Sequence, residues 1–255
     1  MNTPILDLAK HLDAAAMNAD AVPQISLEQE LSLSDAYKVQ VASMDQRLER
    51  GEKLLGYKMG FTSKAKMEQM GVHELIWGRL TSNMELKDGG TLELSKYVHP
   101  RAEPEVAFRI SKDIEGALQR EDIPQYVDAV CVAIEIIDSR YKNFKFSLED
   151  VVADNCSSTG YLLGEWLSAE TKIDGLSISL EVNGEVVQSG STNDILGNPW
   201  NSFLEATRIF KREGIELKKG MVLLAGAATP AVFLKPGDKV KASCDGLGEV
   251  SLEAL

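Results

Sequence analysis

Hydrophobic residues recur at helical spacing over the first 50 positions of the chain. The first helix is predicted from apolar residues three or four positions apart, namely Ile5, Leu8, Ala9 and Leu12. A second helix is predicted to begin at Ser34-Asp35, where a serine can cap free N–H groups, and to end near Arg50. Residues 21–24 between them form a short extended link.

Strand patterns dominate from about residue 91 onward. Asn183-Gly184 lies between two short apolar runs and is typical of a β-hairpin turn. One further helix is predicted from about Trp200 to Glu213, after Asn198-Pro199, and the last strands are expected over 221–225, 238–243 and 249–253. This order of elements predicts a mixed α+β protein with a coiled or barrel-like sheet.

Composition narrows the class of function. The net charge of −12 argues against nucleic-acid binding, which needs clustered Lys and Arg, and no stretch is apolar enough to span a membrane. The first residues lack the basic and apolar regions of a signal peptide. The cysteines are few and scattered, which favours a reducing cytoplasm over a disulfide framework: Cys131, Cys156 and Cys244. The histidines show no spacing typical of a zinc site or a triad, and structural roles are expected for His11, His73 and His99.

Carboxylates stand out in two apolar runs. Glu103 and Glu105 are two positions apart, so in a strand both side chains point to the same side. Glu135 lies in the run 132–137, which is apolar enough to be buried on both faces, and a carboxylate there must be neutral, paired or metal-bound. If the carboxylates converge, oxygen ligands favour Mg²⁺, Mn²⁺ or Ca²⁺ over zinc. The alternative is that Glu103 and Glu105 mark the solvated face of an antiparallel ribbon.

A lysine lies in the strand pattern of residues 54–63. The alternation predicts that Lys58 faces the side opposite to the neighbouring aromatic residues, between glycines that allow close backbone approach. Thr62 and Ser63 can cap a helix over 64–70 and offer a cradle for a carboxylate. The alternative is an exposed lysine without a role in chemistry.

Two other segments have two interpretations each. The loop around Ile76 is apolar for its position, which suits either closure over a site or packing in the core. The small polar stretch 151–160 suits either the lining of a ligand site or an ordinary turn.

Taken together, these segments resemble the fumarylacetoacetate hydrolase superfamily, and within it the branch of 2-hydroxypenta-2,4-dienoate hydratases and 4-oxalocrotonate decarboxylases. The resemblance covers nearly the whole chain. It is carried by Gly56-Tyr57-Lys58-Met59-Gly60-Phe61-Thr62-Ser63, Gly78-Arg79-Leu80, Pro100-Arg101-Ala102-Glu103-Pro104-Glu105, Ala133-Ile134-Glu135-Ile136-Ile137-Asp138-Ser139-Arg140, Asp154-Asn155, Gly197-Asn198-Pro199 and Gly226–Pro230.

The resemblance implies a β-roll with an N-terminal helical part, divided into residues 1–75 and 76–255. It implies Mg²⁺, with Mn²⁺ as a second choice, held by Glu103, Glu105 and Glu135. Lys58 is then catalytic, as a cationic partner of the substrate or as a proton donor. Further substrate contacts fall on Thr62, Ser63, Ile76, Arg79, Asn155 and Ser157, although salt bridging is an equal role for Arg79, as it is for Arg140.

Position 76 separates the two activities of the branch. Hydratases usually carry an Asp directly before the aromatic-Gly pair, whereas this chain has Ile76, and the segment Met67–Glu74 also resembles the decarboxylases. The resemblance therefore implies metal-dependent decarboxylation of a small 2-oxo dicarboxylate. The alternatives are hydration of a dienoate and a weakly active partner subunit. A homo-oligomer and a complex with a hydratase are the expected assemblies.

Overall fold

The computed structural model describes residues 3–63 and 75–255. The helix expected over 64–70, the segment Met67–Glu74 and His73 lie outside these residues. The helices are α1 (Thr3–Asn18), α2 (Leu33–Glu49), α4 (Ile123–Tyr126), α5 (Leu148–Ala153) and α6 (Pro199–Glu213). The strands of the larger sheet are β1 (Leu54–Gly60), β2 (Ile76–Thr81), β3 (Glu85–Leu86), β5 (Arg101–Ile110), β6 (Val127–Ile137), β7 (Ser158–Leu163), β8 (Leu167–Ser168), β11 (Val222–Ala227) and β12 (Val232–Phe233). Those of the smaller sheet are β4 (Gly90–Leu92), β9 (Ser177–Val182), β10 (Glu185–Ser191), β13 (Lys239–Cys244) and β14 (Gly248–Ala254).

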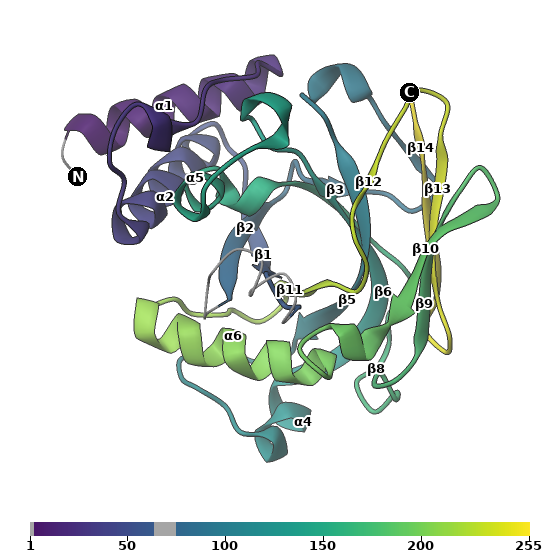
Figure 1. Ribbon diagram of the computed structural model, residues 1–255. Helices are drawn as coiled ribbons and strands as arrows, with labels where there is room; N and C mark the ends of the chain where they lie inside the picture. Colours follow the sequence, from purple (N-terminus) through teal and green to yellow (C-terminus); the bar gives the residue numbers. More distant parts are fainter. Residues whose placement is uncertain (1–2, 64–74) are drawn as a thin grey trace.

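The larger sheet curls on itself. Among the described residues its strand order is β2-β1-β11-β5-β6-β7-β3, with β12 beside β5 and β8 beside β6. β2 and β7 contact each other although they do not pair, so the sheet takes the rolled form visible in Figure 1. The α+β class with a barrel-like sheet is confirmed.

Alternation along β5 and β6 gives the larger sheet two faces of different kind. Phe108, Val130 and Val132 belong to the face that packs on the smaller sheet and α6. Phe108 lies 4.7 Å from Trp200 of α6, measured between ring centres, and burial of such an aromatic side chain stabilises the fold by about 2–3 kcal/mol. The opposite face carries a smaller apolar cluster that includes Ala107 and Cys131, and the carboxylates continue along this face.

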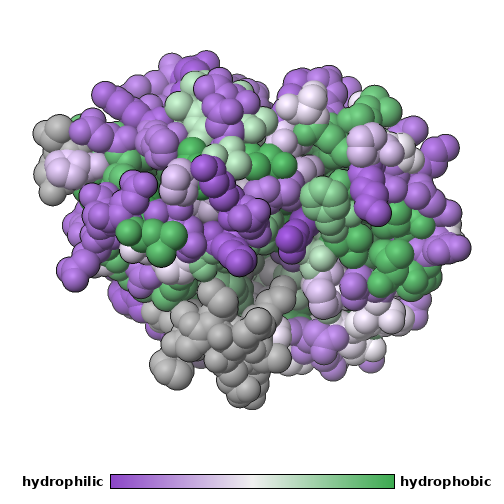
Figure 2. Space-filling model, turned by 45° about the horizontal axis from the view of Figure 1, so that its top comes forward, coloured by the Kyte–Doolittle hydropathy of each residue, from purple (hydrophilic) through white to green (hydrophobic). Residues whose placement is uncertain are grey.

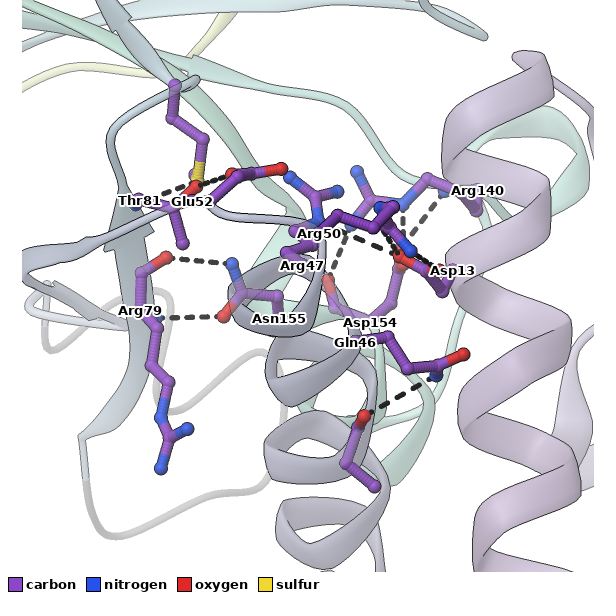
Figure 3. Close-up of polar contacts among 12 residues, drawn as sticks. Asp13, Gln46, Arg47, Arg50, Glu52, Arg79, Thr81, Arg140, Asp154 and Asn155 are labelled. Carbon is purple, nitrogen blue, oxygen red and sulfur yellow. Dashed lines mark hydrogen bonds and ion pairs between the residues drawn. The ribbon is translucent and has the colours of Figure 1, made fainter.

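α2 packs on α1 and on α5 (Figure 1), and its Tyr37 stacks on Trp77 of β2 with ring centres 4.8 Å apart. Gln40 of α2 is fully buried and donates to the carbonyls of Trp77 and Val152, at 3.0 Å each, which ties α2 to β2 and α5. The side-chain carboxylate of Asp13 accepts two hydrogen bonds from Arg50 and so joins α1 to α2 (Figure 3). The division at residue 75 stays a prediction; β1, which it assigns to the N-terminal part, pairs with β11 and β2 in the larger sheet.

Three element assignments were wrong or missing. The segment that begins at Ile76, expected as a loop, is strand β2. α2 begins at Leu33 with Ser32 as its cap, because the Ser32 hydroxyl accepts from the Asp35 amide, so Ser34 lies inside the first turn. The polar stretch near residue 151 contains α5, whose cap is Ser147. By contrast, the hairpin at Asn183-Gly184 and the helix after Asn198 are confirmed.

No helix among the described residues is long and apolar enough to cross a membrane. Figure 2 shows one face of the molecule, on which hydrophilic residues predominate and hydrophobic residues form separate patches.

Candidate active site

Three carboxylates converge on the inner face of the larger sheet. Glu103 on β5 lies directly opposite Glu135 on β6 in the antiparallel register, and Glu105 follows two positions along β5. One oxygen of each carboxylate lies within 4.8 Å of the others. All three side chains are buried, so the interpretation of Glu103 and Glu105 as a solvated face is wrong.

The electrostatics of this cluster call for a cation. Burial and the charges of Glu135 and Glu103 hold the pKa of Glu105 well above its usual range. Burial also raises the pKa of Glu135, against the opposing charge of Lys58. Glu105 Oε2 accepts from the Gly226 amide at 2.7 Å, while its Oε1 is buried and has no hydrogen-bond partner among the described residues. An oxygen-only donor set with an unsatisfied buried oxygen fits a hard divalent cation such as Mg²⁺.

Lys58 lies on β1, and its side chain reaches the carboxylate of Glu135 on β6. It is 3% exposed, its Nζ lies 2.9 Å from Glu135 Oε2, and it donates to the carbonyl oxygen of Cys156 at 3.3 Å. Burial alone would lower the pKa of Lys58, but the charges of Glu135 and Glu103 raise it above its ordinary value. An ammonium has three N–H donors, so one remains for a ligand in the cavity.

The carbonyl that orients Lys58 belongs to a strained turn. Asn155, Cys156 and Ser157 all have left-handed backbone angles, with φ of 50°, 52° and 59°. Such a conformation costs about 1–2 kcal/mol per non-glycine residue, so the fold must brace it. The Asn155 side chain accepts from the Arg79 amide at 2.8 Å and donates to the Arg79 carbonyl at 2.9 Å (Figure 3).

A buried ion pair braces the same turn at Asp154, the residue directly before it. The guanidinium of Arg140 pairs with the carboxylate of Asp154 and also donates to the Asp154 carbonyl, at 2.6 Å (Figure 3). Both residues are 3% exposed. Asn155 therefore fixes the turn to β2, and Arg140 fixes it to the segment that follows β6. In this position the turn holds the Cys156 carbonyl against Lys58.

A cavity of ≈ 310 Å³ opens above the carboxylates. Part of the lining is polar, with Lys58, Glu103 and Ser157, and the Ser157 hydroxyl is buried without a hydrogen-bond partner among the described residues. The apolar part of the lining, called the apolar wall below, consists of Phe61, Ile76, Ile137, Phe144, Phe146 and Val151. The arrangement suits a ligand with a charged end at the carboxylates and an apolar middle.

The structure brings together most of the residues predicted for the site. Lys58, Ile76, Ser157 and Glu103 line the cavity, and Glu105 and Glu135 lie beside them. Thr62 and Ser63 line a neighbouring cavity of ≈ 650 Å³.

Two predicted substrate contacts point elsewhere. Arg79 does not line the cavity; its Nη1 lies 3.3 Å from Asp45, which is the salt-bridging role left open for it. Asn155 uses its amide group on the backbone of Arg79. The geometry gives both residues a place in the wall behind the cavity and gives no support to direct substrate contact.

Sequence reasoning did not select Arg101 and Phe144, which also line the cavity. The Arg101 guanidinium carbon lies 3.8 Å from the centre of the Phe144 ring. A signal for Arg101 was present, because it precedes Glu103 by two positions and so shares its face of the strand. Phe144 lies in a loop and has a φ of 54°, a left-handed conformation that the local sequence does not predict.

Gly226 offers a test of how tightly Glu105 is held. An alanine side chain at Gly226, where φ is 104°, would overlap with Thr62, whereas one at Gly220, where φ is 87°, meets no atom within 4 Å. We expect G220A to lower the free energy of unfolding by about 1–2 kcal/mol and G226A by about 1–3 kcal/mol more. G226A also weakens Mg²⁺ binding, because its amide no longer fixes Glu105. Denaturant unfolding and metal titration of both variants measure these effects; equal losses of stability and unchanged metal affinity contradict the assignment.

Comparison with known proteins agrees with this geometry. Residues 74–253 match the family described as fumarylacetoacetate (FAA) hydrolase, C-terminal. The chain belongs to the fumarylacetoacetate hydrolase family.

Relatives within this family include enzymes of two activities. The chain is 44% identical to a 4-oxalocrotonate decarboxylase from Pseudomonas sp, over 96% of this chain and 95% of the relative. It is 31% identical to the 2-hydroxyhexa-2,4-dienoate hydratase of Comamonas testosteroni, over 88% of this chain and 87% of the relative. The crystal structure of 4-oxalocrotonate decarboxylase from Pseudomonas putida G7, complexed with magnesium and adipate, matches with a TM-score of 0.95 and 36% identity, over 99% of this chain and 97% of that one.

Proposed function

We propose that this family member decarboxylates 4-oxalocrotonate (2-oxo-3-hexenedioate) to 2-hydroxypenta-2,4-dienoate and CO₂, in meta-cleavage catabolism of aromatic compounds. The observation that carries the proposal is the cavity itself. Glu103, Glu105 and Glu135 lie close enough together to hold a divalent cation, and the cation of Lys58 and the apolar side chain of Ile76 line the same cavity as Glu103. The decarboxylase relatives, which align over nearly the whole chain, support it.

The metal end of the cavity is assigned to the 2-oxo acid end of the substrate. Glu103, Glu105 and Glu135 would hold Mg²⁺, or Mn²⁺, and that cation would act there as a Lewis acid toward a 2-oxo carboxylate. The magnesium in the similar crystal structure of the Pseudomonas putida G7 enzyme supports this choice of metal.

Lys58 acts on the oxygen where charge develops. Breaking the bond to the distal carboxylate releases CO₂, and the electron pair moves through the C3–C4 double bond onto the C2 oxygen. That oxygen then takes up a proton from solvent, which gives 2-hydroxypenta-2,4-dienoate. Lys58 has one N–H left after its contacts with Glu135 and Cys156, and it donates that N–H to the C2 oxygen. The Cys156 carbonyl keeps the ammonium turned toward this position.

The apolar wall keeps water from the reacting carbons. Ile76 is 4% exposed and lines the cavity together with Phe61 and Val151. Hydration of a diene needs water and a proton at this place, whereas loss of CO₂ does not. This wall therefore favours decarboxylation over the hydratase activity named for other relatives.

Replacing Ile76 by aspartate tests the role of this wall. We expect I76D to lower the rate of CO₂ release about 10- to 100-fold, which corresponds to ~1.4–2.7 kcal/mol of activation free energy, because a carboxylate brings water and a competing charge to the cavity. The control I76L keeps the wall apolar and should keep the rate. Unchanged CO₂ release by I76D contradicts this role of Ile76.

The identity of the products separates the candidate functions. The purified chain is supplied with 2-oxo-3-hexenedioate and, separately, with 2-hydroxypenta-2,4-dienoate, each in Mg²⁺. The proposal predicts CO₂ release from the first and no consumption of the second. Water addition to the dienoate would identify a hydratase, and no turnover of either would indicate a subunit that acts only with a partner.

We infer further that the protein forms homo-oligomers, associates with a dienoate hydratase and works in the cytoplasm. The proposed product is a tautomer of 2-keto-4-pentenoate, the compound in the names of hydratase relatives, so a complex could pass it on directly. The three cysteines are free and buried, which suits a reducing compartment. Sedimentation of the protein alone and with such a hydratase measures both assemblies.

A further inference from the structure

Arg101 brings a positive charge to the cavity, and the mechanism above does not use it. Its side chain leaves β5 on the same face as Glu103 and lies half-buried against the Phe144 ring. Its Nε is buried and has no hydrogen-bond partner among residues 3–63 and 75–255. The guanidinium of Arg101 thus lies at the cavity with an N–H donor, on Nε, that has no acceptor among the described residues. An anionic group of a ligand would supply that acceptor.

The ring beneath Arg101 is held firmly. Phe144 contacts His99 on one side and Phe146 on the other, with ring centres 5.3 Å and 5.5 Å away. Asn143 and Phe144 both have left-handed backbone angles, with φ of 62° and 54°. The loop therefore accepts about 1–2 kcal/mol of strain per residue in presenting this ring to the guanidinium.

The spacing along β5 matches the length of a small dicarboxylate. Two residues of a strand span about 7 Å, which is the separation of Arg101 and Glu103 along the chain. An extended six-carbon dicarboxylate spans about 6 Å between its terminal carbons. A ligand with its 2-oxo acid end at Glu103 and Glu135 therefore brings its other carboxylate to Arg101. Lys58 does not serve that carboxylate, because the one N–H left after its contacts with Glu135 and Cys156 is assigned to the C2 oxygen.

We propose that Arg101, stacked on Phe144, forms the subsite for the distal carboxylate and makes the cavity select 2-oxo dicarboxylates over 2-oxo monocarboxylates. This inference rests on the proposed function, which supplies the dicarboxylate. The same contact also helps turnover to finish: after CO₂ has left, the product has no distal carboxylate, so Arg101 no longer holds it.

The test is a comparison of two ligands of equal chain length. Calorimetry in Mg²⁺ measures the binding of 2-oxoadipate, which has a distal carboxylate, and of 2-oxohexanoate, which ends in a methyl group. A charge-assisted hydrogen bond corresponds to a preference of about 10- to 100-fold for 2-oxoadipate in the wild type. R101Q is expected to bind both ligands with equal affinity. R109Q is the matched control, because Arg109 lies on the same strand but pairs with Asp128 at its far end.

Kinetics and a second variant complete the test. R101Q should raise KM for 2-oxo-3-hexenedioate by the same factor and should not lower kcat, because the negative charge that Arg101 binds in the substrate leaves the distal carboxylate in the transition state. R101K keeps the charge without the planar fork and should restore part of the preference. F144L keeps Arg101 but removes the aromatic ring on which it stacks, so it should reduce the preference for 2-oxoadipate. This variant also tests the subsite if R101Q does not fold.

The outcomes distinguish this inference from the proposed function. If the wild type prefers 2-oxoadipate and R101Q does not, the subsite is supported. If both ligands bind and R101Q keeps the wild-type preference, only the subsite is overturned. If the wild type binds neither ligand in Mg²⁺, the subsite and the proposed function both fall.

Discussion

Replacing Glu105 by glutamine is expected to abolish metal-dependent turnover in a chain that remains folded. Glutamine keeps the shape of the side chain, and its carbonyl can still accept from the Gly226 amide. It removes one of the three negative charges that would hold the cation. We expect CO₂ release to fall at least about 10³-fold, as for the loss of a group that stabilises developing charge in a dry site. E185Q, which changes an exposed glutamate of β10, should have wild-type activity.

Stability separates this effect from damage to the fold. Because the folded pKa of Glu105 is raised, the metal-free wild type loses stability as pH rises above the ordinary glutamate value of 4.5 toward the folded pKa. E105Q lacks this titration, so at neutral pH without metal it should be at least as stable as the wild type. Mg²⁺ should then raise the melting temperature of the wild type and leave that of E105Q unchanged. A wild type that is more stable than E105Q without metal would contradict the account.

Replacing Lys58 by methionine is expected to stop turnover while the protein still binds metal. Methionine fills the volume of the side chain but supplies no N–H to the substrate oxygen. We expect kcat to fall by about 10²–10³-fold. Mg²⁺ affinity should remain or increase, because the variant loses a cation that competes for Glu135 at 2.9 Å.

The metal-free form of K58M should be unstable. Removing one partner of a buried ion pair leaves Glu135 uncompensated, which costs about 3–5 kcal/mol. Mg²⁺ should recover most of this loss, and calorimetric melting with and without Mg²⁺ measures it. K53M, at an exposed lysine just before β1, is the control. Loss of metal binding in K58M would show that Lys58 supports the site rather than the reaction.

The carboxylates and the lysine were predictable because local rules select them. Glu103 and Glu105 share a face by the two-residue period of a strand, and Glu135 is a charge in a run that must be buried. Local sequence patterns do not predict the register that sets Glu103 opposite Glu135, because this register depends on how two separate strands pair. Recognition of the family motifs supplied this convergence.

The rest of the cavity was less predictable. The left-handed turn at Asn155–Ser157 runs against the local preference of three non-glycine residues, and it exists because contacts with Arg79 and Arg140, which lie on other segments, brace it. For Arg79, substrate contact and salt bridging were equal expectations, and its side chain points to Asp45. Arg101 was not predicted as a site residue, although it lies two positions before Glu103 and so points to the same side of the strand. Such orientations depend on tertiary contacts, which a single sequence does not reveal.

The most direct test of the central claim follows one labelled carbon. Metal-free enzyme is supplied with 2-oxo-3-hexenedioate labelled with ¹³C at the distal carboxylate, before and after addition of Mg²⁺. The account predicts labelled CO₂ and unlabelled 2-hydroxypenta-2,4-dienoate only in the presence of Mg²⁺, and neither from E105Q. Equal release of labelled CO₂ without metal, or retention of the label in the organic product, would contradict it.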